Sequence, residues 1–367
     1  MVKLFNTRRY KLKNPELRRF LKDKISVAAL LILVLMYLGI LFAGFFAVYD
    51  KDYSNRKLSY APPSNVYFID KEGKFTKPYT YNWKREFNKD TLSIEYRQDR
   101  SHKYYLKFFK KGFEYKFLGF IKCKRHFISV EDGGELYLLG LDINGRDNFS
   151  RLLYGGQISL TIGFLALFIS FPIGLLYGGI SGYLGGKIDN IMMRFAEAIM
   201  SVPSFYLLII LAAILPSGMT SSQRFALITI ILAFIGWAGF ARVVRGMVLS
   251  IKTQDYVKAA LVSGCSRTRI ILKHILPQTS SYVIIAVALS VPSYILAESG
   301  LSFLGLGIQQ PDAIWGNMLK EAQEFANIIY RPWLLTPGFL IFVAVLSYNL
   351  IGDTIRDVLD PKSKIKA

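Results

Sequence analysis

The long apolar stretches of this 367-residue chain contain few ionisable residues, and those few are the first candidates for chemistry. Arg194 and Glu197 lie three residues apart, on one face of a helix. Such a pair predicts either a local ion pair or a gate that ties two helices. Glu298 lies in another apolar stretch, and ionisable groups in such places usually face protein or water. Pro203 interrupts a third stretch, as a hinge or as a kink relieved by packing. These four residues are candidates for lining a path between the helices or for gating it.

No constellation of residues predicts catalysis or metal binding. His102, His126 and His274 have no ligand-like spacing, and the sequence contains neither a CxxC nor an HExxH motif. No Ser/His or paired-Asp arrangement falls in the apolar stretches, which disfavours an intramembrane enzyme. The glycine-rich run 178–186 lacks the Gly-Lys-Ser/Thr ending of a phosphate-binding loop, so it predicts close helix packing and a tight turn. We expect no catalytic residue, no metal and no cofactor in this chain.

Composition places the chain in a membrane. Hydrophobic residues make up 52% of it and charged residues 20%, whereas a soluble domain has about a quarter charged. A helix needs about 20 apolar residues to cross the bilayer core. Six stretches are predicted as spans, at about 25–48, 159–183, 191–215, 225–244, 280–301 and 332–352. We therefore expect an all-α polytopic membrane protein, with a leader over 1–24, an anchor helix over 25–48, a core over 152–353 and a tail over 354–367.

The 46 Lys and Arg residues, which contribute to a net charge of +20, are grouped beside the predicted spans. Nine precede Ile25, and seven lie between Arg242 and Lys273, where Asp255 is the only acid. Because basic residues beside spans mark the cytoplasmic side, both termini and the loop over 245–278 are predicted to be cytoplasmic. This grouping, with no recognition motif, disfavours nucleic acid as a partner and leaves membrane lipid as the surroundings.

Residues 49–151 form a predicted insert on the other side of the membrane. Short runs rich in Tyr and Phe, such as 104–109 and 113–120, are bounded by turn signals and predict a small β-rich unit between the first two spans. The insert is either a docking or gating surface for an external partner or a stabilising lid on the first two helices. The sequence leaves both readings open.

The predicted cytoplasmic loop contains the most informative segment, from Asp255 to Pro277. Residues 256–262 predict a short helix, and Gly264 is placed to end it, because glycine adopts the left-handed cap conformation without strain. A second amphipathic helix is predicted from Ser266 until Pro277 starts the fifth span. The two helices would form a projecting elbow whose small apolar residues let a partner approach closely.

This segment resembles the EAA loop of ABC-importer membrane subunits, where Glu-Ala-Ala is followed by three residues, Gly, nine residues, then Ile-x-Leu-Pro. Five positions match this pattern without a gap, namely Ala259, Ala260, Gly264, Leu276 and Pro277. Two positions depart from it, with Lys258 in place of the Glu and His274 in place of the Ile. The Lys258 departure affects any ion-pair role of the Glu but not the elbow itself.

Other stretches resemble the C-type permease of dipeptide and oligopeptide importers. They are Leu139–Asp147, where Leu141 replaces the usual Thr, the run 301–307, and Asn349–Asp357 followed by Asp360-Pro361. The resemblance covers the leader, the first span and everything from about 138 onward. The insert, at roughly 50–135, is longer than in a typical member and is comparable to that of microcin-uptake relatives.

The resemblance implies a permease subunit of an ATP-driven peptide importer in a bacterial cytoplasmic (inner) membrane. Such chains enclose a path with a second, similar permease, bind two ATPase subunits, and receive solute from an extracytoplasmic binding protein. ATP and Mg²⁺ would be held by the ATPases, so this chain would not be an enzyme. The elbow, including Tyr256, would rest in an ATPase groove and transmit its closure. Glu298 would contact the substrate's amino terminus or the binding protein, or lie in water at the outer rim.

Two alternatives remain open. Importers of nickel, oligosaccharides and microcin-like peptides share this subunit family, so the solute could belong to one of these classes. A stand-alone secondary transporter predicts inverted repeats or charges near the membrane midplane. We find no repeat, and the charged residues cluster near the ends of the predicted spans.

Overall fold

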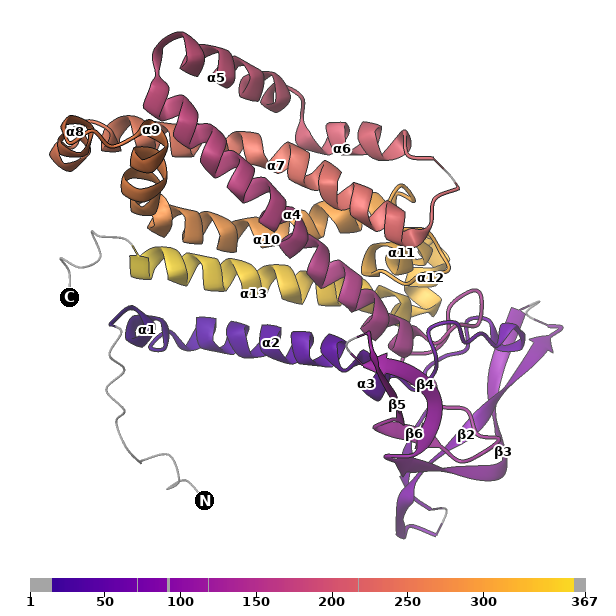
Figure 1. The fold of residues 1–367 in the computed structure, drawn as a ribbon. Coiled ribbons are helices and arrows are strands. Elements are labelled where there is room, and N and C mark those ends of the chain that lie inside the picture. Colours follow the sequence, from indigo (N-terminus) through magenta and orange to yellow (C-terminus); the bar gives the residue numbers. More distant parts are fainter. Residues whose placement is uncertain (1–14, 71, 91–92, 118, 217, 360–367) are drawn as a thin grey trace.

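The computed structural model describes residues 15–70, 72–90, 93–117, 119–216 and 218–359. The first 14 residues of the predicted leader and the last eight of the predicted tail lie outside the described residues. The helices form one elongated bundle, and the strands gather beyond one end of it (Figure 1). We call this the insert end, and the opposite end, where α8 lies, the elbow end.

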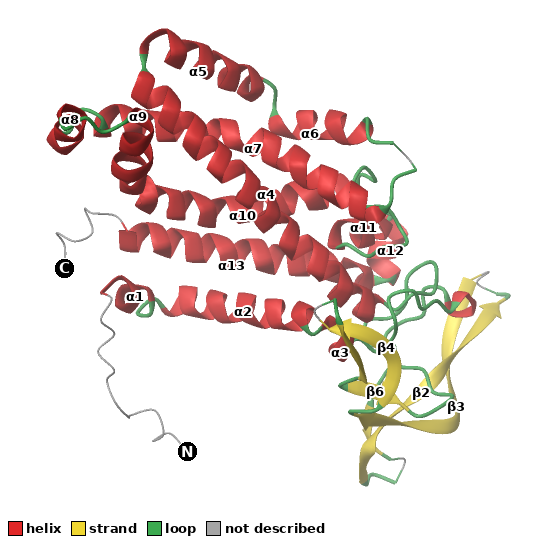
Figure 2. Cartoon of the chain, in the orientation of Figure 1, coloured by secondary structure: helices red, strands yellow, loops and turns green. Residues whose placement is uncertain are grey.

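Within the described residues, five helical stretches are long and apolar enough to cross a membrane, or six if a bent pair counts as one span. The long helices are α2 (Lys24–Leu41), α4 (Asn148–Leu184), α7 (Ser221–Ile251), α10 (Ser280–Phe303) and α13 (Thr336–Leu359). The short helices α1 (Pro15–Phe20) and α3 (Ala43–Phe46) flank α2. The predicted fold class, a helical membrane protein with a small β-rich insert, is confirmed (Figure 2).

Some predicted helix ends are wrong. Helix α2 stops at Leu41 rather than Val48, because the chain turns at Phe42 before α3. Helix α4 begins at Asn148, well before the apolar stretch, because the Asp147 carboxylate accepts a 2.8 Å hydrogen bond from the Ser150 backbone N–H. Caps rather than hydropathy set these ends.

The span predicted over about 191–215 is broken at Pro203, where the sequence left a hinge or a kink open. The segment forms α5 (Gly186–Ser201) and α6 (Ser204–Ala213), which are bent by 79° at the break between them. Val202 is extended, with φ −89° and ψ 129°. Proline disfavours the helical conformation of the residue before it, so Pro203 forces the break.

Three glycines bring α4 and α7 into close contact, as the glycine-rich run predicted. A Cβ at Gly174, Gly178 or Gly182 would lie 2.9, 2.3 or 2.8 Å from backbone oxygens of α7. These residues recur every fourth position, so they form one face of α4. The predicted tight turn follows at Gly185, with φ +68°. Both parts of the packing prediction are confirmed.

Among the described residues, the insert contains six strands in two sheets. Strands β1 (Tyr67–Ile69), β2 (Phe75–Asn88), β3 (Ser93–Phe108) and β6 (Ile128–Val130) form an antiparallel sheet in the order β1-β2-β3-β6. Strands β4 (Lys111–Phe117) and β5 (Ile121–Arg125) form a separate hairpin. The fully buried Tyr137 and Leu141 lie in the insert's own core, which packs beside the insert end of the bundle (Figure 1).

Short helices cover the insert end of α10. They are α11 (Trp315–Leu319), the 3₁₀ turn η4 (Lys320–Gln323), α12 (Phe325–Tyr330) and the 3₁₀ turn η5 (Pro332–Leu335). Gly316 lets α11 approach α10, because a Cβ there would lie 2.5 Å from the Ser299 backbone oxygen. The indole N–H of Trp315 donates a 2.9 Å hydrogen bond to the Leu152 carbonyl of α4. This cap therefore joins α10 to α4.

Candidate functional site

Helix α8 (Asp255–Val262) projects from the elbow end of the bundle (Figure 1). Within α8 only Val257 is buried, at 3% exposure, whereas Leu261 is 57% and Val262 88% exposed. Apolar side chains grouped at an exposed tip are typical of a surface that another protein covers.

The turn after α8 has the glycine cap that the sequence predicted. Gly264 has φ +77°, its N–H donates to the Leu261 carbonyl at 3.0 Å, and the Cys265 N–H donates to the Ala260 carbonyl at 3.1 Å. This pair of bonds is the Schellman arrangement, which satisfies the last carbonyls of the helix. Glycine is favoured because other residues are strained at positive φ.

The predicted second elbow helix is only partly correct. The regular helix α9 covers just Arg267–Arg269, and a π-helical turn η2 (Ile270–Ile275) and a 3₁₀ turn η3 (Leu276–Thr279) follow it. The backbone then continues directly into α10, so Pro277 does not separate two helices. Proline lacks an N–H, and the changed hydrogen-bond spacing accommodates it. The elbow is therefore joined to α10 without a loop.

The residues of the predicted coupling loop separate into an exposed group and a buried group. Tyr256, Lys258, Ala259, Gly264 and Pro277 are exposed, Ala260 and His274 are half-buried, and Leu276 is buried. The Lys258 ammonium lies 3.4 Å from the Asp255 carboxylate, within the same helix. The buried Ile270, Ile275 and Leu276 fix the base of the elbow in the core. The elbow is thus firmly held at its base and free at its tip.

Arg194 and Glu197 form the local ion pair that the sequence allowed, with 3.2 Å between Arg194 Nη1 and Glu197 Oε2. Glu197 Oε1 also lies 3.2 Å from Arg242 Nη2 of α7. Glu197 therefore joins a residue of its own helix to a residue of α7, and a role of this pair as a gate stays a prediction.

Glu298 does not lie in water at a rim, and that reading is wrong. The side chain is 0% exposed, and α11 packs against the nearby Ser299 and Ser302 of the same helix. Ser302 Oγ donates a 2.5 Å hydrogen bond to Glu298 Oε1, and Oε2 has no partner among the described residues. Arg194 and Glu197 lie on α5 and Pro203 at the bend that follows it, whereas Glu298 lies within α10.

Sequence reasoning missed a charged clamp at the elbow end. The Asp189 carboxylate of α5 accepts hydrogen bonds from Arg245 of α7, at 3.0 Å from Nε and also from Nη2. Ser181 of α4 donates to the same carboxylate at 2.6 Å. Asp189 is 5% exposed. Bidentate arginine–carboxylate pairs fix geometry, so this clamp holds three helices together. The sequence signal was an acid just after Gly185-Gly186.

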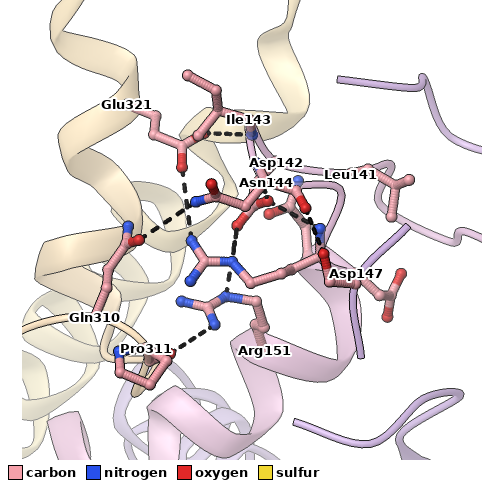
Figure 3. A network of polar contacts seen from close by, with 12 residues as sticks. Leu141, Asp142, Ile143, Asn144, Asp147, Arg151, Gln310, Pro311 and Glu321 are labelled. Carbon is pink, nitrogen blue, oxygen red and sulfur yellow. Dashed lines mark hydrogen bonds and ion pairs between the residues drawn. The ribbon is translucent and has the colours of Figure 1, made fainter. Parts of the chain in front are cut away.

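A buried polar network at the insert end was also missed (Figure 3). Asp142 accepts a 2.6 Å hydrogen bond from Arg146 Nε, and its other oxygen accepts from the Arg146 backbone N–H at 2.9 Å. Arg151 Nη1 donates to the Pro311 carbonyl at 2.9 Å, and Glu321 Oε2 accepts from the Ile143 N–H at 3.1 Å. The network joins the loop before α4 to the segment after α10.

Burial raises the pKa of two acids at the insert end that lie outside the spans. Burial and the nearby Asp142 carboxylate raise the pKa of Glu321 to about 7, and burial raises the pKa of Asp147 to about 7. Both groups therefore titrate near neutral pH, although they accept hydrogen bonds from backbone N–H groups. The part of the chain that the structure describes contains no group of three or more His, Cys, Asp or Glu side chains that could hold a metal.

The chain is similar to known transport proteins along two stretches. Residues 170–365, more than half of the chain, match the family of binding-protein-dependent transport system inner membrane components. Residues 17–63 match the N-terminal transmembrane domain of oligopeptide transport permease C. The family resemblance stated from the sequence is confirmed.

Individual relatives agree with the family match. The chain is 44% identical over 229 residues to the oligopeptide transport system permease protein OppC of Haemophilus influenzae, covering 62% of this chain and 71% of that protein. It is 43% identical over 225 residues to the dipeptide transport system permease protein DppC of Bacillus subtilis, with coverages of 61% and 68%. It is 40% identical over 226 residues to the glutathione transport system permease protein GsiD of Escherichia coli, with coverages of 61% and 72%. From the exposed elbow, the apolar spans and these matches, we conclude that the chain belongs to the family of binding-protein-dependent transport system inner membrane components.

Proposed function

We propose that this chain is the permease subunit of an ATP-driven peptide importer. The elbow is the observation that carries this proposal, because an exposed apolar helix with a buried base is suited to pass movement from a partner into the spans. The relatives are named as oligopeptide, dipeptide and glutathione permeases, and glutathione is itself a tripeptide. A peptide is therefore the solute class that these names support.

The orientation follows from the charge at the elbow end. Lys252, Lys258, Arg267, Arg269 and Lys273 lie in or beside the elbow. This excess of basic residues favours a cytoplasmic elbow, cytoplasmic termini and an extracytoplasmic insert in a bacterial inner membrane. Two ATPase subunits would bind from the cytoplasm, and a solute-binding protein would bind from outside. A second, similar permease would complete the path.

Coupling uses the continuous backbone between α8 and α10. The ATPases would hold ATP and Mg²⁺, and this chain would bind neither. Closure of the ATPase pair around ATP would move α8, and the π-helical and 3₁₀ turns would pass that movement to α10 without a flexible loop. Only a difference in affinity between two arrangements of the permease can drive the change, so the elbow must fit the closed and open ATPases differently.

Residues at the bend at Pro203 are the candidates for lining the solute path. A cavity of about 420 Å³ lies between α6, α7 and α10 at this bend. Its lining is mostly apolar, and it also contains Pro203 and small or hydroxylated residues, among them Ser204, Gly236, Ser290 and Ser293. Small polar residues leave room for a solute backbone, so we assign the path to this face of the bundle.

The test is co-purification of the ATPase with the tagged chain from its own membrane. Val262→Asp places a charge at the exposed tip and is expected to lower recovered ATPase at least tenfold, because an unpaired charge would be buried in the contact. The matched variant Phe75→Asp, at an 86% exposed position of β2, should leave recovery unchanged. Unchanged recovery and peptide uptake in Val262→Asp would contradict the proposal. Uptake by the purified chain without ATP would favour a secondary transporter.

A further inference from the structure

A pocket of about 890 Å³ lies at the junction of the insert with the helical core. Its walls come from four separate segments, which are the stretch before β1, the β2–β3 hairpin, the loop before α4, and the end of α12 with η5. The β2–β3 hairpin lies outside both family matches, because one match ends at residue 63 and the other begins at residue 170. This pocket therefore depends on the part of the chain that distinguishes it from the family pattern.

Hydrogen bonds hold the walls of the pocket together. The Tyr96 hydroxyl of β3 donates to the Ser59 carbonyl. The Trp333 indole N–H of η5 donates to the Leu141 carbonyl at 3.2 Å, and the Tyr60 N–H donates to the Asp142 carbonyl at 3.0 Å. Each bond joins two different segments, so the pocket is formed before any ligand arrives.

Two arginines give the pocket its charge. Arg85 and Arg331 line it, and no Asp or Glu is among its lining residues. Among the described residues, neither guanidinium lies within 4.0 Å of a carboxylate. Arg85 Nη1 donates a long, 3.5 Å bond to the Lys57 carbonyl, and Arg331 Nη1 donates to the Asn327 amide oxygen. Each guanidinium has five N–H donors, so most of these remain available to an anion.

Aromatic rings form much of the remaining lining of the pocket. Tyr60, Tyr96, Tyr330 and Trp333 line it, and the Arg331 guanidinium lies 3.7 Å from the centre of the Tyr60 ring. Tyr60 has φ +66°, a conformation that is strained for a residue with a bulky side chain. Strain of this kind is often found at ligand sites, where the surrounding structure fixes a side chain in one position.

We infer that this pocket binds a short peptide through its C-terminal carboxylate, which Arg331 and Arg85 receive, while the rings take the last side chain. Arginine forms charge-assisted hydrogen bonds with carboxylates, and tyrosine and tryptophan offer flat apolar contact. The volume lies within the range of small-molecule sites, about 300–1,000 Å³. The inference rests on the proposed function, because it takes peptides as the solute. It adds a peptide site on the permease itself, outside the spans.

The first arm of the test uses the unmodified full chain in detergent, without ATPase or binding protein. An N-terminally fluorescein-labelled Ala-Ala-Phe peptide with a free C-terminus is titrated with the protein, and binding is followed by fluorescence anisotropy. The same labelled peptide with a C-terminal amide lacks the charge that pairs with arginine. We expect the amide to bind at least tenfold more weakly. Equal binding of the two peptides, or no binding of either, would overturn the inference.

The second arm locates the site. Arg331→Gln and, separately, Arg85→Gln are each expected to weaken binding of the free-acid peptide about tenfold. Arg100→Gln, at an exposed arginine of β3 outside the lining of the pocket, is the matched control and should bind as the unmodified chain does. Unchanged binding in both pocket variants would overturn the inference. ATPase co-purification is measured separately, from membranes that contain the whole assembly. No peptide binding by the unmodified chain, with normal ATPase recovery, would refute only the pocket, whereas unchanged ATPase recovery in Val262→Asp would contradict only the proposed function.

Discussion

The two ends of this molecule handle charge and apolar surface in opposite ways. At the elbow end, apolar side chains of α8 are exposed and its ion pair, Asp255–Lys258, lies in solvent. At the insert end, Asp142, Arg146 and Arg151 are each less than a tenth exposed. The elbow has the properties of a surface that a partner covers. The insert end has those of a contact already formed within the chain. Under the proposed function, movement would enter at the elbow and the insert end would resist it.

The largest expected effect comes from removing the central acid of the buried network. Asp142→Ala leaves Arg146 and Arg151 buried without their carboxylate, which should lower the free energy of unfolding by about 3–5 kcal/mol. Asp255→Ala, which removes a fully exposed acid from α8, is the matched control and should change it by less than about 0.5 kcal/mol. Thermal unfolding in detergent measures both. Equal losses in the two variants would remove the contrast between the ends.

A smaller effect is expected from the pH dependence of the insert end. Because the pKa of Glu321 is raised from 4.5 to about 7 in the folded chain, the folded state binds a proton that the unfolded state releases between these values. Stability should therefore fall as pH rises from 5 to 7.5. Glu321→Gln should flatten this fall and raise the melting temperature at pH 7.5 by about 5 °C. Melting curves across this range measure the slope.

A charge change elsewhere controls for this experiment. Glu324→Gln removes an acid from the same segment but outside the buried network, so its slope should match that of the unmodified chain. Asp147, whose pKa is also raised to about 7 by burial, should leave part of the slope in Glu321→Gln. A steeper slope in Glu321→Gln than in the unmodified chain would contradict the assignment of this pH dependence to Glu321.

Gly264→Val tests the turn that sets the direction of the elbow. A β-branched residue at φ +77° costs about 1–2 kcal/mol, although the space around the added side chain is empty. The strain should reorient α8 and reduce ATPase recovery several-fold, while the melting temperature of the spans changes little. Gly39→Val, in α2 where the surrounding space is also empty, is the matched control. Equal ATPase recovery in the two variants would show that the turn is not required.

The smallest effect is expected at Lys258, the departure from the family's Glu. Its ion pair with Asp255 joins a 62% exposed side chain to a fully exposed one, so Lys258→Ala should change the free energy of unfolding by less than about 0.5 kcal/mol. A loss of more than about 1 kcal/mol, measured by thermal unfolding, would mean that α8 is held by more than its buried base.

Much of the elbow could be predicted from the sequence because its signals are local. At the end of α8, the Gly264 N–H bonds to the carbonyl three positions back and the Cys265 N–H to the carbonyl five positions back. The spacing of small residues marks the exposed helix. Glu298 shows where local reasoning fails. Its distance along α10 placed it near the end of a span, but the tertiary structure buries it, and α11 folds back against neighbouring residues of α10. Hydropathy carries no information about a segment that folds back.

The apolar spans, the strand-rich insert, the glycine turn and the break at Pro203 could be predicted from local patterns, since each depends on residues within a few positions of one another. Which charges meet depends instead on the packing of distant elements. Asp189 pairs with Arg245, 56 positions away, and Glu321 lies against the loop of Asp142, because α5 and α7 pack side by side and the α11 cap folds over α10. The pocket lined by Arg85 and Arg331 likewise depends on how separate segments pack together. Helix and strand periods fix the direction of a side chain relative to its own element, whereas its partner depends on how the elements pack.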